Sequence, residues 1–376
     1  MGFPVISEIA LETIRREFAD NFVLRGEVGA SLSIWTGDTE ICSLHAGFRD
    51  RDRSIAWDDQ TIVPIWSATK GPAAATVLLA LHESALTPDS PIGELWPELG
   101  CGTLAGQAIG DLLSHQCGLS GLDEPAHVFD HDAVVAALEN QRPIWTPGDG
   151  HGYHPRTFGF LADELVRRAV GVPLAEFWRA RIADPLGLHL WIGLPEAEDH
   201  RVAELLTPRP GTDPASMEFY RALGKPGSLS ATAFASPRGL GGIPEMNRPE
   251  TRRLSLPGFG GIGSASALAR FYAILANGGL SEGVRILPEE ITRWASATRT
   301  EGLDRILLAP TTFSSGFMKN SPAFPTGAFG HPGAGGSHAF ADPSRGIGFA
   351  YVMNQMERSV FPTEKALSLV RALQDR

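Results

Sequence analysis

A serine and a lysine stand three residues apart where a helix is expected to begin. The stretch PIWSATKG, residues 64–71, contains Ser67 and Lys70 and leads from a strand-like run into PAAATVLLALH. Positions i and i+3 of a helix share a face, so the hydroxyl and the amine would be neighbours. Such a lysine can take the proton of a nucleophilic serine. The alternative is that Ser67 caps the helix and Lys70 is a solvated surface residue, because S-x-x-K alone is a weak motif.

A tyrosine is the candidate third group. Tyr153 lies in HGYHPRTFGF, residues 151–160, in a predicted loop just before a helix. It can exchange a proton with the serine if the ammonium group of Lys70 lowers the pKa of the phenol. An ordinary half-buried tyrosine is the alternative. The remaining tyrosines fall in helical or strand patterns and are better explained by packing: Tyr220, Tyr272 and Tyr351.

A glycine-rich segment, FGHPGAGGSHAFADP (residues 329–343), lies beside a predicted strand. Backbone without side chains lets a substrate carbonyl approach closely and offers N–H groups to it. His331 opens the segment and can meet a polar group of a substrate. A simple glycine turn is the alternative. A further segment, DLLSHQCGLSG (residues 111–121), is predicted to be a helix end and a turn, and we assign it no chemistry.

Strand-like segments lie near both ends of the chain, and helical segments lie between them. GASLSIWTG (29–37) and TEICSLHAGF (39–48) are predicted to be paired strands, and strand patterns return from residue 305 onward. Helical patterns occupy residues 75–250, with a weakly periodic, irregular part from about 200 to 250. The pattern predicts a sheet built from both chain ends, with a helical region inserted in the middle.

Composition narrows the function classes. The 376 residues are 43% hydrophobic and 20% charged, as in a globular enzyme, and the net charge of −11 without a basic patch argues against nucleic acid. No run of 18 apolar residues is present, so we expect no membrane span. Three cysteines at no metal-like spacing, and a first segment unlike a secretory signal, favour a cytoplasmic location. They are Cys42, Cys101 and Cys117.

In this order, the segments W-S-A-T-K, L-L-S-H-Q-C-G-L, G-Y-H-P and H-P-G-A-G-G-S…F-A-D-P resemble the serine β-lactamase-like family. The likeness is greatest to class C β-lactamases and family VIII carboxylesterases, and it covers nearly the whole chain. It implies the α/β (α+β) fold of β-lactamases and penicillin-binding proteins, with an antiparallel sheet flanked by helices. Residues 1–70 and 255–376 would form the α/β domain, residues 71–254 the helical domain, and the site would lie in the cleft between them.

The resemblance also implies roles for residues. Ser67 would be the nucleophile, Lys70 the base, and Tyr153 the group that carries the proton to the leaving group. The backbone N–H groups of Ser67 and Ala334 would form the oxyanion hole, and His331 would stand where lactamases carry the lysine of Lys-Thr-Gly. The residues expected to contact substrate are Trp66, His154, His331, Gly333 and Gly335.

Three departures from the lactamase pattern favour ester hydrolysis. The chain has no K-T-G, so a mostly neutral histidine replaces the cation that grips a β-lactam carboxylate. Proline follows in Tyr153-His154-Pro155, where the family has Tyr-x-Asn, and it cannot supply a side-chain amide. The sequence also offers no candidate for the glutamate that deacylates class A β-lactamases. We therefore expect a hydrolase of small-molecule esters, with short acyl chains, that works through an acyl-enzyme on Ser67 without cofactor or metal.

Other functions fit parts of the pattern. A β-lactamase, a D-amino-acid peptidase and an acyltransferase share the acyl-enzyme step. An α/β-hydrolase requires G-x-S-x-G, which is absent. A metal hydrolase could draw on two histidine pairs, His151 with His154 or His127 with His131, but neither has an obvious third ligand. A non-catalytic binding protein would be expected to lose Ser67, Lys70 or Tyr153.

Overall fold

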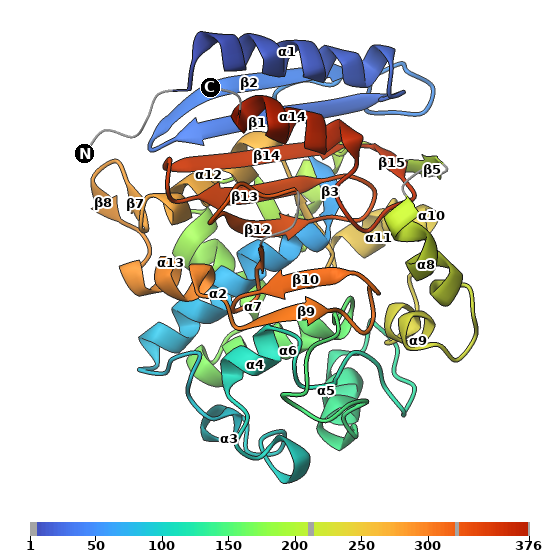
Figure 1. Ribbon diagram of the computed structural model, residues 1–376, viewed down its shortest axis with the longest axis vertical. Helices are drawn as coiled ribbons and strands as arrows, with labels where there is room; N and C mark the ends of the chain where they lie inside the picture. The colour runs from blue at the N-terminus through green and yellow to red at the C-terminus, as the bar shows by residue number, and fades with distance from the viewer. Residues whose placement is uncertain (1–5, 210–213, 320–322, 375–376) are drawn as a thin grey trace.

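An eight-stranded antiparallel sheet dominates the computed structural model, which describes residues 6–209, 214–319 and 323–374 (Figure 1). The strand at residues 29–36 pairs on one side with the strand at 39–47 and on the other with the strand at 347–353, so the expectation of a sheet built from both chain ends is confirmed. The strands, in spatial order, are β2 (Thr39–Gly47), β1 (Gly29–Thr36), β14 (Ile347–Met353), β13 (His338–Asp342), β12 (Phe329–Pro332), β11 (Met318–Lys319), β10 (Pro310–Phe313) and β9 (Thr300–Leu303).

Helices cover both faces of this sheet. Successive side chains of a strand point to opposite faces, and β14 shows which helix lies on which side. At Gly348 an added Cβ would meet the carbonyl oxygen of Ala269, in α12 (Ala265–Ala276), at 2.0 Å. Three residues on, the Tyr351 hydroxyl lies 3.4 Å from Asn21 Nδ2, in α1 (Glu8–Val23), which packs against α14 (Glu364–Gln374). The sheet therefore lies between α12 and the pair α1–α14.

A buried helix, α2 (Lys70–Glu83), runs through the middle of the molecule and connects the sheet to the helical part. Its first twelve residues are all buried, which accounts for their alanine- and leucine-rich sequence. It packs against two of the inserted helices, α6 (Thr157–Val170) and α7 (Leu174–Trp178). The other helices of this part are α3 (Ile92–Leu95), α4 (Ile109–Leu113) and α5 (His131–Asn140), while α13 (Glu289–Ser296) follows α12.

Three small sheets complete the strand pairing. Strand β3 (Val63–Trp66), which leads into the S-x-x-K segment, pairs with β6 (Gly261–Gly263), and β6 pairs with β4 (Leu190–Ile192). The others are the parallel pair β5 (Leu206–Arg209) with β15 (Gln355–Glu357), and the hairpin of β7 (Leu280–Ser281) with β8 (Val284–Arg285).

Residues 200–250 differ from the irregular segment that we expected. The described part contains β5 and four short helices, α8 (Pro214–Leu223), α9 (Leu229–Ala235), α10 (Ile243–Met246) and α11 (Pro249–Arg252), which lie together on one side of the molecule (Figure 1). The longest has ten residues, and α10 and α11 have proline in their first turn. Helices this short show too few turns for an apolar period to be recognised.

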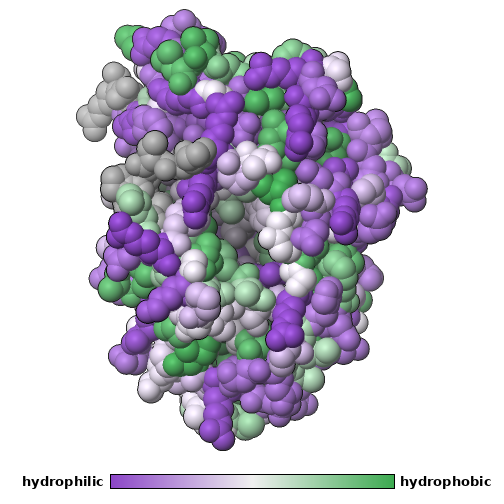
Figure 2. Space-filling model, turned by 90° about the vertical axis from the view of Figure 1, so that its right-hand side faces the viewer, coloured by the Kyte–Doolittle hydropathy of each residue, from purple (hydrophilic) through white to green (hydrophobic). Residues whose placement is uncertain are grey.

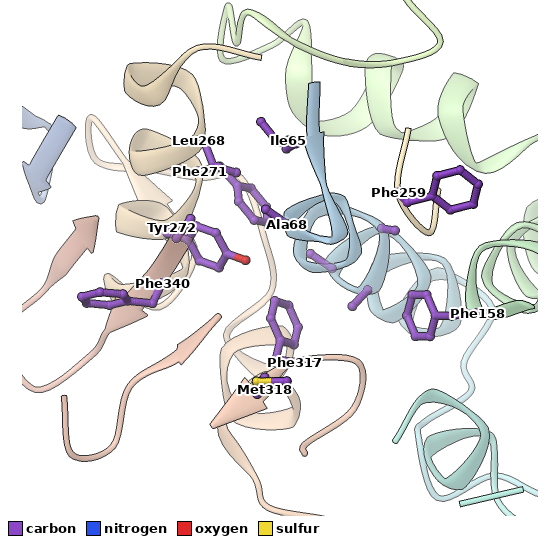
Figure 3. Packing of buried hydrophobic residues seen from close by; sticks show 14 of the residues in the cluster. Ile65, Ala68, Phe158, Phe259, Leu268, Phe271, Tyr272, Phe317, Met318 and Phe340 are labelled. Atoms are coloured by element: carbon purple, nitrogen blue, oxygen red, sulfur yellow. The ribbon is translucent and has the colours of Figure 1, made fainter. Parts of the chain in front are cut away.

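The core closes tightly around the start of α2. Figure 3 shows Tyr272, from α12, with its hydroxyl directed toward the beginning of this helix, near Ala68 and Phe317. A Cβ added to Gly71 would lie 1.9 Å from that hydroxyl oxygen. Glycine immediately after Lys70 therefore allows Tyr272 to pack against the helix that carries the site.

Candidate active site

Ser67 occupies the corner where strand β3 turns into helix α2. It begins a 3-10 turn, Ser67–Thr69, and its side chain is half-buried. The preceding Trp66 has φ 51° and ψ −133°, a strained conformation for a bulky residue. The Thr69 hydroxyl donates to the Trp66 carbonyl and accepts the N–H of Gly261 at 2.8 Å, which fixes the corner against β6. The strained turn is thus held by a side chain two residues beyond Ser67.

Lys70 is fully buried, and its Nζ has three polar neighbours. It lies 3.3 Å from Ser67 Oγ, 2.9 Å from the Pro155 carbonyl oxygen and 2.7 Å from the Gly258 carbonyl oxygen. No carboxylate forms an ion pair with it in the described part of the chain. Burial therefore holds the pKa of Lys70 well below its ordinary value.

The neighbours of Lys70 determine which way its lone pair points. A neutral amine has two N–H donors and one lone pair, whereas a carbonyl oxygen can only accept. The carbonyls of Pro155 and Gly258 therefore take the two N–H groups. The lone pair is left for the third neighbour, the hydroxyl of Ser67. In this geometry the amine is an acceptor for the Ser67 proton.

Tyr153 lies in the loop that precedes α6, as expected, and its ring centroid is 4.8 Å from Lys70 Nζ. Its hydroxyl interacts with the Ser67 side chain. The condition set for proton exchange with the serine, a Tyr153 pKa lowered by Lys70, is not met. Burial raises this pKa, the Ser67 hydroxyl opposes that only in part, and the charge of Asp304 raises the pKa further. The physical reason is that burial disfavours a charged phenolate, and the negative charge of Asp304 disfavours it further.

The glycine-rich segment after β12 lies against the strand that leads to Ser67. A Cβ added to Gly333 would lie 2.2 Å from the carbonyl oxygen of Ile65, so only glycine permits this approach. The next residue, Ala334, is half-buried. Within residues 6–209, 214–319 and 323–374, neither the N–H of Ser67 nor that of Ala334 donates a hydrogen bond. Both donors that we expected to form an oxyanion hole are therefore free.

His331 and Trp66 keep unsatisfied ring nitrogens. His331 lies buried in β12, its Nδ1 donates to the Pro332 carbonyl at 2.7 Å, and its Nε2 has no partner in the described structure. Its ring centroid is 5.8 Å from that of Tyr153. Burial lowers the pKa of His331 to about 3, so the ring is neutral and Nε2 is an acceptor. Trp66 is half-buried, and its Nε1 likewise lacks a partner.

Two of the residues expected to contact substrate have their polar groups bonded within the protein. The Nδ1 atoms of His154 and His115 lie 3.2 Å apart, and His154 Nε2 accepts the N–H of Leu119 at 2.9 Å. The ring of His154 therefore has no free polar atom. At Gly335 the N–H donates to the Ser359 carbonyl at 2.9 Å, and an added Cβ would collide with Met356.

The sequence reasoning missed two buried residues around Tyr153. His115, in the segment to which we assigned no chemistry, has φ 66°, and its ring centroid lies 5.0 Å from that of Tyr153 in an edge-on contact. Asp304 lies in the β9–β10 connection, and both of its carboxylate oxygens are 3.1 Å from Tyr153 N. A polar residue at a helix end before glycine was a weak signal for His115. No local signal identified Asp304.

The histidine pairs considered for a metal have other partners. His151 bonds the hydroxyls of Thr300 and Thr311 at 2.9 and 2.7 Å, and His131 pairs with Asp163 at 2.9 Å. In the described residues, no group of three or more His, Cys, Asp or Glu side chains could hold a metal ion.

Comparison with known proteins decides the family. The family model described as "Beta-lactamase" matches residues 16–373. The chain belongs to the beta-lactamase family. The family resemblance read from the ordered motifs is therefore confirmed, and so is the β-lactamase and penicillin-binding-protein fold.

Relatives within the family include esterases. The chain is 30% identical over 371 residues to the "Esterase/beta-lactamase LipL" of Mycobacterium tuberculosis, covering 93% of this chain and 82% of that protein. Among solved structures, a family VIII carboxylesterase has a TM-score of 0.87 at 31% identity, covering 100% of this chain and 99% of the other. A penicillin-binding protein homologue from Caulobacter crescentus has a TM-score of 0.85 at 33% identity, covering 99% of each chain.

Across the described residues, no helix is both long and apolar enough to cross a membrane.

Proposed function

We propose that this beta-lactamase family member is a serine hydrolase that cleaves small carboxylic esters through an acyl-enzyme on Ser67. The observation that carries the proposal is the environment of Lys70. Its amine is fully buried, its pKa is lowered, and two carbonyls direct its lone pair toward Ser67 Oγ, 3.3 Å away. The similarity to esterases supports the choice of ester as substrate.

Acylation follows from these groups. Lys70 takes the Ser67 proton while Oγ forms a bond to the ester carbonyl carbon, and the oxyanion is held by the N–H groups of Ser67 and Ala334. The tetrahedral intermediate then collapses, and its bond to the alcohol oxygen breaks. Tyr153 gives its proton to that oxygen and recovers one from the Lys70 ammonium. The products are the free alcohol and an ester of Ser67.

Deacylation uses the same groups in reverse. Water replaces the alcohol, passes a proton through Tyr153 to Lys70, and attacks the acyl carbonyl carbon. Ser67 leaves as its alkoxide and is protonated by Lys70, so the free enzyme and a carboxylic acid result. A protonated Tyr153 suits the role of donor, since burial and the Asp304 charge both raise its pKa.

His331 supports an ester over a β-lactam. A β-lactam carries a carboxylate, which a cation would bind. His331 has a pKa of about 3 and presents an unpartnered acceptor nitrogen, which repels a carboxylate rather than binding it. A neutral ester places no negative charge there, and Trp66 and Gly333 complete the proposed contacts.

We also propose that residues 1–70 and 255–376 form one domain, that residues 71–254 form the other, and that the site lies in the cleft between them. Lys70 supports this division, because its partners Pro155 and Gly258 come from the two parts. The molecule is hollowed near the centre of the side that carries α8–α11 (Figure 2). A cytoplasmic location is proposed as well, supported by the three unpaired cysteines.

Mass spectrometry of the intact protein after incubation with a fluorophosphonate, followed by peptide mapping, tests the function. We expect one label per chain, on Ser67, no label on Ser67→Ala, and no hydrolysis of a short-chain aryl ester by that variant. Its circular dichroism should match that of the wild type. Absence of label, or label on another serine, would contradict an activated Ser67 and favour a binding role for the fold.

A further inference from the structure

Asp304 is a fully buried carboxylate with an unusual number of hydrogen-bond donors around it. Oδ1 accepts the N–H groups of Ile306 and Leu307, each at 2.8 Å, and Oδ2 lies 3.3 Å from the Thr311 hydroxyl. Both oxygens lie 3.1 Å from Tyr153 N, 151 residues away in sequence. The first two contacts shape the β9–β10 connection itself. The contact with Tyr153 ties that connection to the active-site loop.

A chain of side-chain hydrogen bonds ends at the same carboxylate. Thr311 Oγ1 lies between Asp304 Oδ2 and His151 Nε2, which is 2.7 Å away, and His151 Nδ1 lies 2.9 Å from Thr300 Oγ1. The hydroxyl of Thr311 has one proton, and only a donor satisfies a carboxylate. Thr311 therefore donates to Asp304, His151 Nε2–H donates to Thr311, and Thr300 donates to His151 Nδ1. Every member of the chain is satisfied when Asp304 is ionised.

The β9–β10 hairpin thereby grips both sides of the Tyr153 loop. Besides the carboxylate on Tyr153 N, the N–H of Arg305 donates to the His151 carbonyl at 3.1 Å. From β10, the Phe313 ring is stacked on the Tyr153 ring at an interplanar angle of 12°. The backbone and the ring of Tyr153 are thus held by one hairpin, while its hydroxyl end meets Ser67.

We propose that Asp304 is a positioning residue for Tyr153: by binding the Tyr153 N–H, its carboxylate holds the phenol where it can donate a proton to the leaving alcohol. The inference rests on the proposed function and adds a residue to it. Asp304 does not touch Ser67 or Lys70 by any hydrogen bond in the described residues, so it acts through Tyr153. Its negative charge works in the same direction, because it helps to keep the phenol protonated.

The leaving group separates this role from a general loss of structure. An alkoxide must be protonated as it leaves, whereas a nitrophenolate departs without help. The value of kcat/KM reports the steps up to acylation. In Asp304→Asn we expect kcat/KM for an ethyl ester to fall about 10²-fold, a typical contribution of acid–base catalysis. For the nitrophenyl ester of the same acid we expect a fall of less than about 5-fold, and labelling of Ser67 by a fluorophosphonate should change as little.

A double-mutant cycle tests whether the effect passes through Tyr153. Asp304→Asn combined with Tyr153→Phe should be no slower on the ethyl ester than Tyr153→Phe alone. The matched control is Asp342→Asn, which removes another buried carboxylate, one that binds Ser344 and Arg345 at the end of β13. It should leave the ratio of the two ester activities unchanged.

Thr311→Val replaces Asp304→Asn if the latter does not fold. This substitution keeps the shape of the side chain and the Asp304 carboxylate, but it removes one hydrogen-bond donor to Asp304 and the link to His151. The ethyl-ester activity should again fall more than the nitrophenyl-ester activity, with a smaller difference between the two esters than in Asp304→Asn. Equal losses of activity on both esters, or losses that multiply in the double mutant, would overturn the positioning role of Asp304. If Ser67 is still labelled in these variants, the proposed function stands. An unlabelled wild-type Ser67 would overturn both.

Discussion

Lys70 Nζ lies 3.3 Å from Ser67 Oγ and has given its two N–H groups to the carbonyls of Pro155 and Gly258. The amine is therefore an acceptor toward Ser67 and a donor toward everything else. The same pocket has two effects on the amine. Burial lowers the pKa of Lys70, and the two carbonyls direct its lone pair toward Ser67. Both are needed if the lysine is to act as a base at neutral pH.

Lys70→Met should therefore lower kcat about 10³-fold with little change in KM, because the base is lost while the substrate contacts stay. In the wild type, activity should disappear as the pH falls through the lowered pKa of Lys70, since the protonated amine has no lone pair. Steady-state kinetics between pH 5 and 9 would measure both. Lys225→Met, at an exposed lysine, is the control. A kcat near that of the wild type in Lys70→Met would contradict the role of Lys70 as the base.

Tyr153→Phe should lower kcat/KM for an ethyl ester about 10²-fold and affect the nitrophenyl ester far less, because only the alkoxide needs the phenolic proton. The ring packing against Phe313 and His115 is retained, so the free energy of unfolding should change little. Equal rates for the two esters relative to wild type would show that Tyr153 is a packing residue. Urea unfolding of the same samples would separate the two cases.

Gly71→Ala should destabilise the protein by about 1–3 kcal/mol, because the new methyl group collides with the Tyr272 hydroxyl. That hydroxyl is buried without a side-chain partner in the described structure. Tyr272→Phe alone should therefore alter stability little, and the double variant Gly71→Ala with Tyr272→Phe should recover most of the loss. Thermal unfolding of the three variants measures this. A double variant no more stable than Gly71→Ala would place the strain elsewhere.

Acid should unfold the protein through its buried histidines. Burial lowers the pKa of His154 and His331 to about 3, and that of His151 and His338 to about 4. Between pH 6.5 and 4 the unfolded chain binds protons at these positions and the native state does not. Stability therefore falls as the pH falls, by up to ~1.4 kcal/mol per pH unit for each histidine.

Groups with a raised pKa oppose this trend: burial raises the pKa of Glu27, and the hydrogen bond to Asp163 raises that of His131. The pKa of Asp304 is raised to about 6, so the native state binds a proton before the unfolded chain does. These three groups are fewer than the histidines whose pKa is lowered, which also include His115 and His189. The free energy of unfolding in urea, measured at pH 7, 5.5 and 4.5, should decrease steadily. A constant value across these pH values would contradict neutral histidines in the folded state.

Local patterns carried much of the architecture. Alternating strands at 29–37 and 39–48, the helix after Ser67 and the helix after Tyr153 were all recognisable, because each depends on the spacing of apolar residues within a few turns or a hairpin. The short helices between residues 214 and 252 were not, since helices of four to ten residues show no clear period.

Sequence alone determined that Ser67 and Lys70 would be neighbours, since three residues at a helix start bring their side chains to one face. Only the tertiary structure decided what that pair can do. Pro155 and Gly258, which direct the lysine, are 85 and 188 residues away, and Asp304 is 151 residues from the tyrosine that it holds. The same distant contacts bury the lysine and occupy His154. Burial and hydrogen-bond partners arise from chain segments that meet only after folding, and therefore no local pattern encodes them.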